Sequence, residues 1–142
     1  MNAGVRGDTT AGGLKRFETA LPPDTRILIL ELGANDGLRG VAVSAIENNL
    51  SAMITRAEAR GIRVVLCGMM VPPHHGWNYA LAFHDLFPRL AARHGALLVP
   101  FLLQDVALNA DLNGPDGIHP NKAGAARIAE TIWPYLERLL ND

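Results

Sequence analysis

The sequence predicts an α/β fold, a sandwich in which helices cover a parallel sheet. Three apolar runs have the length and composition of strands, and segments with helical spacing of apolar residues separate them. The strand-like runs are nearly continuous in apolar residues instead of alternating with polar ones, which is typical of strands covered on both faces. The alternation of strands with helices therefore predicts helices on both sides of one sheet.

The expected strands are the runs RILILELG (26–33), IRVVLCGMMV (62–71) and ALLVPF (96–101). The opening residues MNAGVRG (1–7) are interpreted as the tail of a further strand that runs into a glycine turn. A parallel α/β domain rarely begins in the middle of a strand. We therefore expect that a segment before residue 1 is missing.

Two helices are expected in the first half of the chain. One lies around residues 8–21, where Asp8 or Thr9 has the side chain of an N-cap. The other lies between the first two full strands and ends before Gly61, a typical C-terminal stop. The inward residues of this second helix, at helical spacing, are Val43, Ile46, Leu50, Met53, Ile54 and Ala57.

Two more helices are expected in the second half. One ends at His94 and Gly95, with Pro88 as a kink, and the last begins near Asn121 and bends at Pro134. Their inward residues are Tyr79, Phe83, Leu86, Phe87 and Leu90 in one, and Ile128, Ile132, Leu136 and Leu139 in the other.

The composition indicates one domain with a single core, spanning residues 1–142. Hydrophobic residues make up 49% of the chain, charged residues 19%, and the net charge is -1, which argues against disorder and against a nucleic-acid surface. No apolar run is long enough to span a bilayer, and the first residues do not resemble a signal peptide. Cys67 is the single cysteine and is expected to be a buried strand thiol.

The loops after the strands are the first places to look for a site, because ligands of parallel sheets bind outside the carboxyl ends of the strands. One such loop holds Asp116 and His119, whose spacing lets the carboxylate orient the imidazole. Orienting one ring nitrogen leaves the other free to accept a proton. This pair is therefore predicted to be a general base with its supporting acid.

Two earlier loops offer donors to a developing oxyanion. The amide of Asn35 and the backbone N–H of Gly7 are the candidates. Taken alone, the alternative for each is a plain turn residue, and for Gly7 that alternative is the favoured one. Adjacent histidines such as His74 and His75 do not easily face one metal ion, and no ligand cluster supports them. No metal site is expected.

Three segments resemble the blocks of a known family. The segments are AGVRGDTTAGGL (3–14), LELGANDGLRG (30–40) and DGIHPNKAG (116–124). They resemble the second, third and fifth blocks of the GDSL, or SGNH, serine hydrolases, in the bacterial acyl-CoA thioesterase, arylesterase and lysophospholipase branch. The resemblance implies a three-layer α/β/α flavodoxin-like sandwich. It also implies hydrolysis of aryl esters, acyl-CoA or lysophospholipids by a Ser-His-Asp mechanism, with no cofactor.

The resemblance also implies roles for residues. Gly7 and Asn35 would be oxyanion donors, and Asp116 and His119 would be the acid and base. The loop with Pro72, Trp77 and Tyr79 would line an acyl pocket.

The family's Gly-Asp-Ser-Leu block, which carries the nucleophile, has no counterpart here. The serines of this chain, Ser44 and Ser51, are expected to be helix caps or solvent-facing, and Asp36 could at most position a water. We therefore expect an N-terminally truncated domain without its first strand and helix, severely impaired or inactive in hydrolysis. The alternative is a non-catalytic ligand-binding or assembly module derived from a hydrolase.

Partners and location follow from the same reasoning. The expected partner is a small ester or thioester, with no nucleic acid and no stable membrane insertion. The missing strand would leave an apolar sheet edge open, which predicts a possible homodimer. The chain as written would be cytoplasmic, whereas full-length relatives are expected to be periplasmic or secreted.

Overall fold

The computed structural model, which describes residues 1–141, contains a parallel three-stranded sheet in the order β1-β2-β3. The strands are β1 (Ile27–Leu30), β2 (Arg63–Cys67) and β3 (Leu97–Val99). In the register of the sheet, Leu28 lies opposite Val64, and Leu66 lies opposite Leu98. The parallel sheet predicted from the apolar runs is confirmed.

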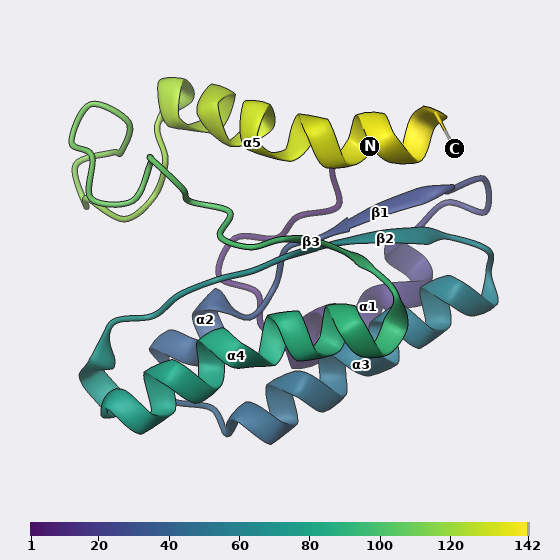
Figure 1. Ribbon diagram of the computed structural model, residues 1–142, viewed down its shortest axis with the longest axis horizontal. Coiled ribbons are helices and arrows are strands. Elements are labelled where there is room, and N and C mark those ends of the chain that lie inside the picture. Colours follow the sequence, from purple (N-terminus) through teal and green to yellow (C-terminus); the bar gives the residue numbers. More distant parts are fainter. Residues whose placement is uncertain (142) are drawn as a thin grey trace.

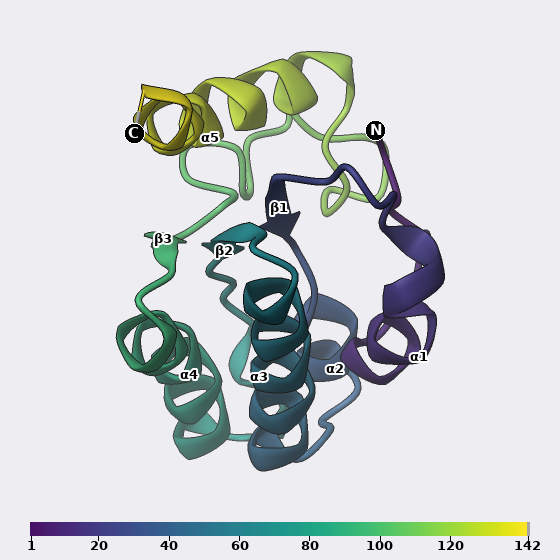
Figure 2. The ribbon, with the colours of Figure 1, turned by 90° about the vertical axis from the view of Figure 1, so that its right-hand side faces the viewer.

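The helices form two layers around this sheet. Helices α1, α3 and α4 lie on one face and α5 lies on the other, as two perpendicular views show (Figures 1 and 2). The three-layer sandwich is therefore confirmed. The helical elements are α1 (Thr10–Ala20), α2 (Ala34–Leu38), α3 (Val43–Ala59), the 3-10 turn η1 (Pro73–His75), α4 (Trp77–His94) and α5 (Lys122–Asn141).

The densest part of the core lies between β2 and the pair α3 and α4. Fully buried side chains come from all three elements. Along α4, the ring of Tyr79 stacks on Phe83, and Phe83 packs edge-to-face against Phe87. Burial of such large apolar groups is the main stabilising contribution to the fold. The largest fully buried side chains of these elements are Ile46, Leu50, Met53, Ile54, Val65, Leu66, Phe83, Leu86, Phe87 and Leu90.

The helix ends lie where local chemistry predicts them. Thr9 is the N-cap of α1, and its hydroxyl accepts a hydrogen bond from the Gly12 N–H at 3.2 Å. Asn121 caps α5 by accepting from the N–H groups of Ala123 and Gly124 at 2.9 and 3.0 Å. Side-chain caps of this kind satisfy N–H groups that have no partner inside the helix.

Three details of the sequence prediction are wrong. Residues 1–5 are not a strand, because they form no ladder with β1 or any other part of the described chain. The three strands are shorter than the apolar runs, since pairing ends where a neighbour ends, as at Val99 before Pro100. The segment after β1 turns directly into the short helix α2 at Gly33, whose φ of +116° a residue with a side chain would rarely adopt.

Cys67 is fully buried at the end of β2, as predicted. Burial, together with the negative charge of Glu31, raises the pKa of its thiol to about 12. The thiol is therefore protonated and unreactive in the folded chain. Among residues 1–141, no helix is both long and apolar enough to cross a membrane.

Candidate active site

The connection from β3 to α5 is an irregular loop that its own side chains hold in place. The Asn113 amide donates to the carbonyls of Val106 and Asn109 at 2.6 and 2.7 Å. A single antiparallel bridge joins Asn113 to Pro120, and the Gly114 N–H donates to the His119 carbonyl at 2.8 Å. The chain between these ties has to form one tight turn, which presents Asp116 and His119 together.

Asp116 and His119 form the contact that their spacing predicts. Nδ1 of His119 lies 2.7 Å from Oδ2 of Asp116. The other carboxylate oxygen accepts from the backbone N–H groups of Ile118 and His119, at 3.1 and 3.0 Å. Because Nδ1 is engaged, Nε2 carries the free lone pair when the ring is neutral, and no group of the described chain bonds to it. The ring can therefore accept a proton at Nε2.

The same contacts act on the charge of Asp116. The backbone N–H of His119, then its side chain and the N–H of Ile118, hold the pKa of the Asp116 carboxyl well below its usual range. The carboxylate stays ionised wherever an imidazolium could form beside it. Both side chains are open to water, with 62% of His119 and 46% of Asp116 exposed.

Gly7 and Asn35 are connected through Asp8. The Asn35 Nδ2 donates to the Asp8 carbonyl at 2.9 Å, and Asp8 directly follows Gly7. Gly7 has a φ of +75°, so the turn needs a residue without a side chain. One proton of the Asn35 amide and the Gly7 N–H have no partner in residues 1–141. Both donors are available to a ligand.

Supports for this turn were not predicted from the sequence. The Arg16 guanidinium bonds to Asp8 at 2.7 Å and to the Ala3 carbonyl at 2.8 Å, which fixes both sides of Gly7. Asp36 accepts from the N–H and the hydroxyl of Thr10. The idea that Asp36 positions a water is wrong, because both of its oxygens are bonded inside the protein and the residue is buried. The sequence signal for the bond between Asp36 and Thr10 is an acidic residue directly after Asn35 together with a threonine in the preceding helix.

The two halves of the candidate site lie at one end of the molecule. The loop before α5 and the short helix α2 are both at the carboxyl ends of the strands (Figure 1). Within residues 1–141, no hydrogen bond joins Asp116 or His119 to Gly7 or Asn35.

The residues expected to line an acyl pocket are either exposed or in contact with other parts of the protein. Trp77 is 72% exposed at the start of α4, and Pro72 is also exposed. The Tyr79 hydroxyl donates to the Val41 carbonyl at 2.7 Å, and its ring packs edge-on against His75. None of the three predicted residues lines the cavity beside β1. Their substrate role stays a prediction.

The two serines lie on α3. Ser44 is exposed, whereas Ser51 is half-buried and its hydroxyl lies 2.8 Å from Nε2 of His94 on α4. The other ring nitrogen of His94 lies 3.4 Å from Glu58. Ser51 is therefore neither a cap nor solvent-facing, which corrects the expectation. It ties α3 to α4, because the end of α4 lies against the middle of α3.

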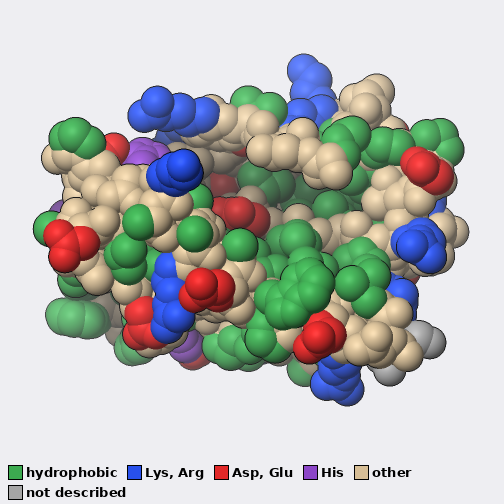
Figure 3. Space-filling model, turned by 90° about the horizontal axis from the view of Figure 1, so that it is seen from above, with side chains coloured by type: hydrophobic (Ala, Val, Ile, Leu, Met, Phe, Trp, Pro, Cys, Tyr) green, Lys and Arg blue, Asp and Glu red, His purple; other side chains and the backbone are tan. Residues whose placement is uncertain are grey.

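A cavity of about 900 Å³ lies beside β1. It runs between β1 on one side and residues 1–8 with α1 on the other. Seen from the α5 side, the surface is hollowed near its middle, with hydrophobic side chains around the hollow (Figure 3). Among residues 1–141, no three His, Cys, Asp or Glu side chains are grouped so as to hold a metal ion.

Comparison with known proteins relates the whole chain to ester hydrolases. The model of the GDSL-like Lipase/Acylhydrolase family matches residues 1–127. Esterase TesA from Pseudomonas aeruginosa is 40% identical over 141 residues, covering 99% of this chain and 70% of that protein. Thioesterase 1/protease 1/lysophospholipase L1 from Escherichia coli K12 is 33% identical, covering 99% of this chain and 68% of that protein. The crystal structure of the psychrotrophic esterase EstA from Pseudoalteromonas sp., inhibited by monoethylphosphonate, has a TM-score of 0.91 at 32% identity and covers 100% of this chain and 78% of that one.

Proposed function

Because this chain belongs to the GDSL-like lipase/acylhydrolase family, we propose that it carries the acid, the base and two oxyanion donors of a serine ester hydrolase. His119 removes the proton of a serine hydroxyl, and Asp116 stabilises the imidazolium that forms. Gly7 and Asn35 donate to the oxyanion of the tetrahedral intermediate. The acyl-enzyme is then hydrolysed by water, with His119 again acting as base.

The single observation that supports these roles most strongly is the contact between His119 and Asp116. The 2.7 Å separation of Nδ1 and Oδ2 fixes which ring nitrogen faces outward. The depressed pKa of Asp116 keeps its charge in place while the ring gains a proton. This is the arrangement that a general base needs before it can serve a hydroxyl nucleophile.

The nucleophile in this proposal belongs to a Gly-Asp-Ser-Leu block, and not to either serine of residues 1–142. Ser51 lies inside α3, where backbone N–H groups are used in the helix and cannot serve an oxyanion. Its partner is His94 and not His119. We therefore propose that the 142 residues alone hydrolyse esters at a severely reduced rate.

The proposed substrates are carboxylic esters and thioesters of small molecules. The relatives are named esterase, arylesterase and thioesterase/lysophospholipase, which share a carbonyl bonded to oxygen or sulfur. Pro72, Trp77 and Tyr79 are proposed to lie on the acyl side of the substrate. The proposed chemistry needs no metal ion or organic cofactor, because the base, the acid and the oxyanion donors are all protein groups.

The test compares two proteins with a p-nitrophenyl ester. One is the 142-residue chain, and the other is the same chain preceded by the part of Pseudomonas aeruginosa TesA that carries the Gly-Asp-Ser block. We expect the fused protein to turn over and to lose about 10⁴-fold or more of its rate in His119→Ala. The matched control, Ser51→Ala, should retain the rate.

Two results would contradict the proposal. The first is turnover by the 142-residue chain that His119→Ala abolishes, since the block would then be unnecessary. The second is a folded fusion that neither hydrolyses the ester nor reacts with a fluorophosphonate, which would favour a binding module.

A further inference from the structure

The short helix α2 carries Asn35 and continues into a tight turn. Residues 34–41, which we call the α2 turn, fold back so that the Arg39 N–H donates to the Asn35 carbonyl at 3.2 Å. The Val41 N–H donates to the Asp36 carbonyl at 3.0 Å. A helix of five residues is too short to be stable through its own hydrogen bonds. The direction in which Asn35 points therefore depends on what the rest of the α2 turn packs against.

Side chains in and before α4 hold the α2 turn at two points. A Cβ added at Gly37 would lie 2.7 Å from side-chain atoms of both Phe83 and Val71, so the backbone there is in close contact with them. Further along the turn, the Tyr79 hydroxyl donates to the Val41 carbonyl at 2.7 Å. Tyr79 is itself stacked on Phe83. Both points of the turn are therefore packed against one row of rings.

His75 holds the middle of the α2 turn. Its Nε2 lies 3.1 Å from the Leu38 carbonyl oxygen, and because a carbonyl only accepts, Nε2 carries the proton in this contact. Leu38 is the last residue of α2, where carbonyl groups have no partner inside the helix. The imidazole ring also covers Gly40, since a Cβ there would lie 3.0 Å or less from three ring atoms. His75 therefore supplies the donor that this helix end lacks and fills the space beside the turn.

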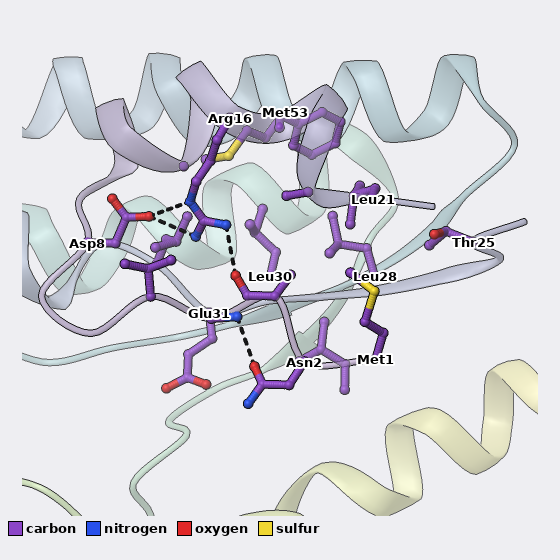
Figure 4. Close-up of a pocket in the computed structure, with 18 of the residues that line it drawn as sticks. Met1, Asn2, Asp8, Arg16, Leu21, Thr25, Leu28, Leu30, Glu31 and Met53 are labelled. Carbon is purple, nitrogen blue, oxygen red and sulfur yellow. Dashed lines mark hydrogen bonds and ion pairs between the residues drawn. The ribbon is translucent and has the colours of Figure 1, made fainter. Parts of the chain in front are cut away.

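The Gly7 turn has a support of its own. The Arg16 guanidinium, on α1, bonds to the carboxylate of Asp8, the residue after Gly7 (Figure 4). The side chain of Arg39 reaches the Gly7 carbonyl from the α2 turn, but at 3.4 Å this hydrogen bond is long. Displacing the α2 turn would therefore act mainly on Asn35.

The contribution of His75 is to geometry more than to stability. The residue is exposed, and replacing an exposed side chain changes the free energy of unfolding by little. An oxyanion donor, in contrast, has to lie within about 0.5 Å of its productive position to act. We therefore expect the loss of His75 to change the turnover rate and not the stability of the fold.

We propose that His75 is a positioning residue for the ester hydrolase reaction. Through its contacts with the α2 turn, it holds the amide of Asn35 where the oxyanion develops. His75 itself does not touch the substrate. The inference rests on the proposed role of Asn35 as an oxyanion donor, whereas the contacts between His75 and the α2 turn do not depend on that role.

The first experiment uses the 142-residue chain and needs no catalysis. In His75→Ala, the amides of Arg39 and Val41, whose hydrogen bonds close the α2 turn, should exchange with solvent about tenfold faster or more. His75→Gln keeps an N–H donor for the Leu38 carbonyl and should exchange as the unchanged chain does. The matched control is His74→Ala, at the exposed neighbour in η1, whose side chain makes no hydrogen bond within residues 1–141. It should leave the exchange rates unchanged.

The second experiment uses the fused enzyme and the p-nitrophenyl ester. His75→Ala should lower kcat by about tenfold, less than the loss of the donor itself, because the amide is displaced and not removed. The KM should change much less. His75→Gln should restore most of the rate, and His74→Ala should retain it.

A double-mutant cycle shows whether His75 acts through Asn35. In an Asn35→Ala background, His75→Ala should lower kcat by less than about twofold, because the donor that it positions is already gone. A side chain that only stabilised the fold would reduce the rate by the same factor in both backgrounds. Tyr79→Phe keeps the ring, removes the hydrogen bond to Val41 and should reproduce these effects, so the proposal stays testable if His75→Ala does not fold.

Three results would overturn the proposal. One is unchanged exchange of the Arg39 and Val41 amides in His75→Ala. Another is an active fusion in which His75→Ala retains kcat, and the third is an equal loss of rate with and without Asn35. A folded fusion that does not turn over would instead contradict the proposed function, and the exchange rates would still decide whether His75 holds the α2 turn.

Discussion

The carboxylate of Asp36 holds the first turn of α1 through Thr10 alone. Oδ2 accepts from the Thr10 N–H at 2.8 Å, and Oδ1 accepts from the Thr10 hydroxyl at 2.7 Å. Asn49 donates to the same hydroxyl oxygen at 3.1 Å, which completes the network. Both Asp36 and Thr10 are buried, so the charge is stabilised by these donors and by the positive end of the helix dipole.

Asp36→Ala should lower the free energy of unfolding by about 2–4 kcal/mol, because it leaves the buried donors of Thr10 without a partner. Urea denaturation followed by circular dichroism measures the change. Asp85→Ala, at an exposed aspartate of α4, is the matched control and should stay within about 0.5 kcal/mol. A similar loss in both variants would contradict the role given to Asp36.

Asn35→Ala should reduce kcat of the fused enzyme by about 10²- to 10³-fold, because one oxyanion donor is lost. The KM should change much less, since this donor acts on the intermediate. Asn48→Ala, at an exposed asparagine of α3, is the control and should retain kcat. If the loss of kcat in Asn35→Ala were fully explained by a lower free energy of unfolding, the role of Asn35 would be limited to its hydrogen bond with the Asp8 carbonyl.

The pKa of Asp116 predicts a pH dependence with a definite sign. A carboxyl whose folded pKa lies below its unfolded value of about 3.9 stabilises the fold above that value, and the contribution is lost as pH falls toward the folded pKa. The Asp116 side-chain carbonyl signal in a ¹³C NMR titration should therefore keep the chemical shift of an ionised carboxylate between pH 7 and pH 4. The same signal in urea-unfolded chain should titrate near pH 4.

His119→Ala gives a second check on the Asp116 pKa. The variant removes the side-chain contact and leaves the two backbone N–H donors, so the Asp116 pKa should rise only part of the way to its unfolded value. A complete return to the unfolded value would mean that the backbone donors contribute nothing.

Glu47 joins α3 to α4 by accepting from Arg89 and Arg93, each at 2.9 Å. The hydrogen bond from Arg89 is the main cause that lowers the pKa of Glu47, so its stabilising contribution is present above about pH 4.5 and lost in acid. Both guanidinium groups are about half exposed, so water and salt weaken the pair. Glu47→Gln should cost about 1 kcal/mol at pH 7 and progressively less as the pH falls below 4.5. A cost that does not decrease in acid would point to packing.

Gly68→Ala should destabilise the fold by about 2–3 kcal/mol. A Cβ there would strike the main-chain carbonyl of Pro100. That carbonyl cannot move freely, because the Gly68 N–H donates to Val99 at 2.7 Å and the Gly68 carbonyl accepts from Leu102 at 3.0 Å. Gly4→Ala, where the nearest atom is the end of a flexible side chain, should be neutral within about 0.5 kcal/mol. Equal melting temperatures for the two variants would refute the argument.

The helices could be predicted from the sequence because their signals are local. Thr9, Gly61, Gly95 and Asn121 end or cap helices through groups within a few residues of themselves. The hydrogen bond between Asp116 and His119 is confirmed for the same reason, since three residues separate the partners. Its catalytic role stays a prediction.

Interactions across long separations could not be predicted. Asp36 and Thr10 are 26 residues apart, and Ser51 and His94 are 43 apart, so no local pattern pairs them. Strand ends depend on neighbouring strands, which is why β3 covers three residues of a six-residue apolar run. The first five residues illustrate the same point, because strand-like composition forms a strand only where a partner is in reach.

The buried thiol of Cys67 can report how often the core opens. A thiol that is fully buried and has a pKa of about 12 reacts with an alkylating reagent only during moments when β2 separates from its neighbours. With no other sulfhydryl in the chain, a single mass increment per molecule reports each such opening, without any introduced dye or isotope. The rate of that increment therefore measures how often the middle of the sheet opens in the folded chain.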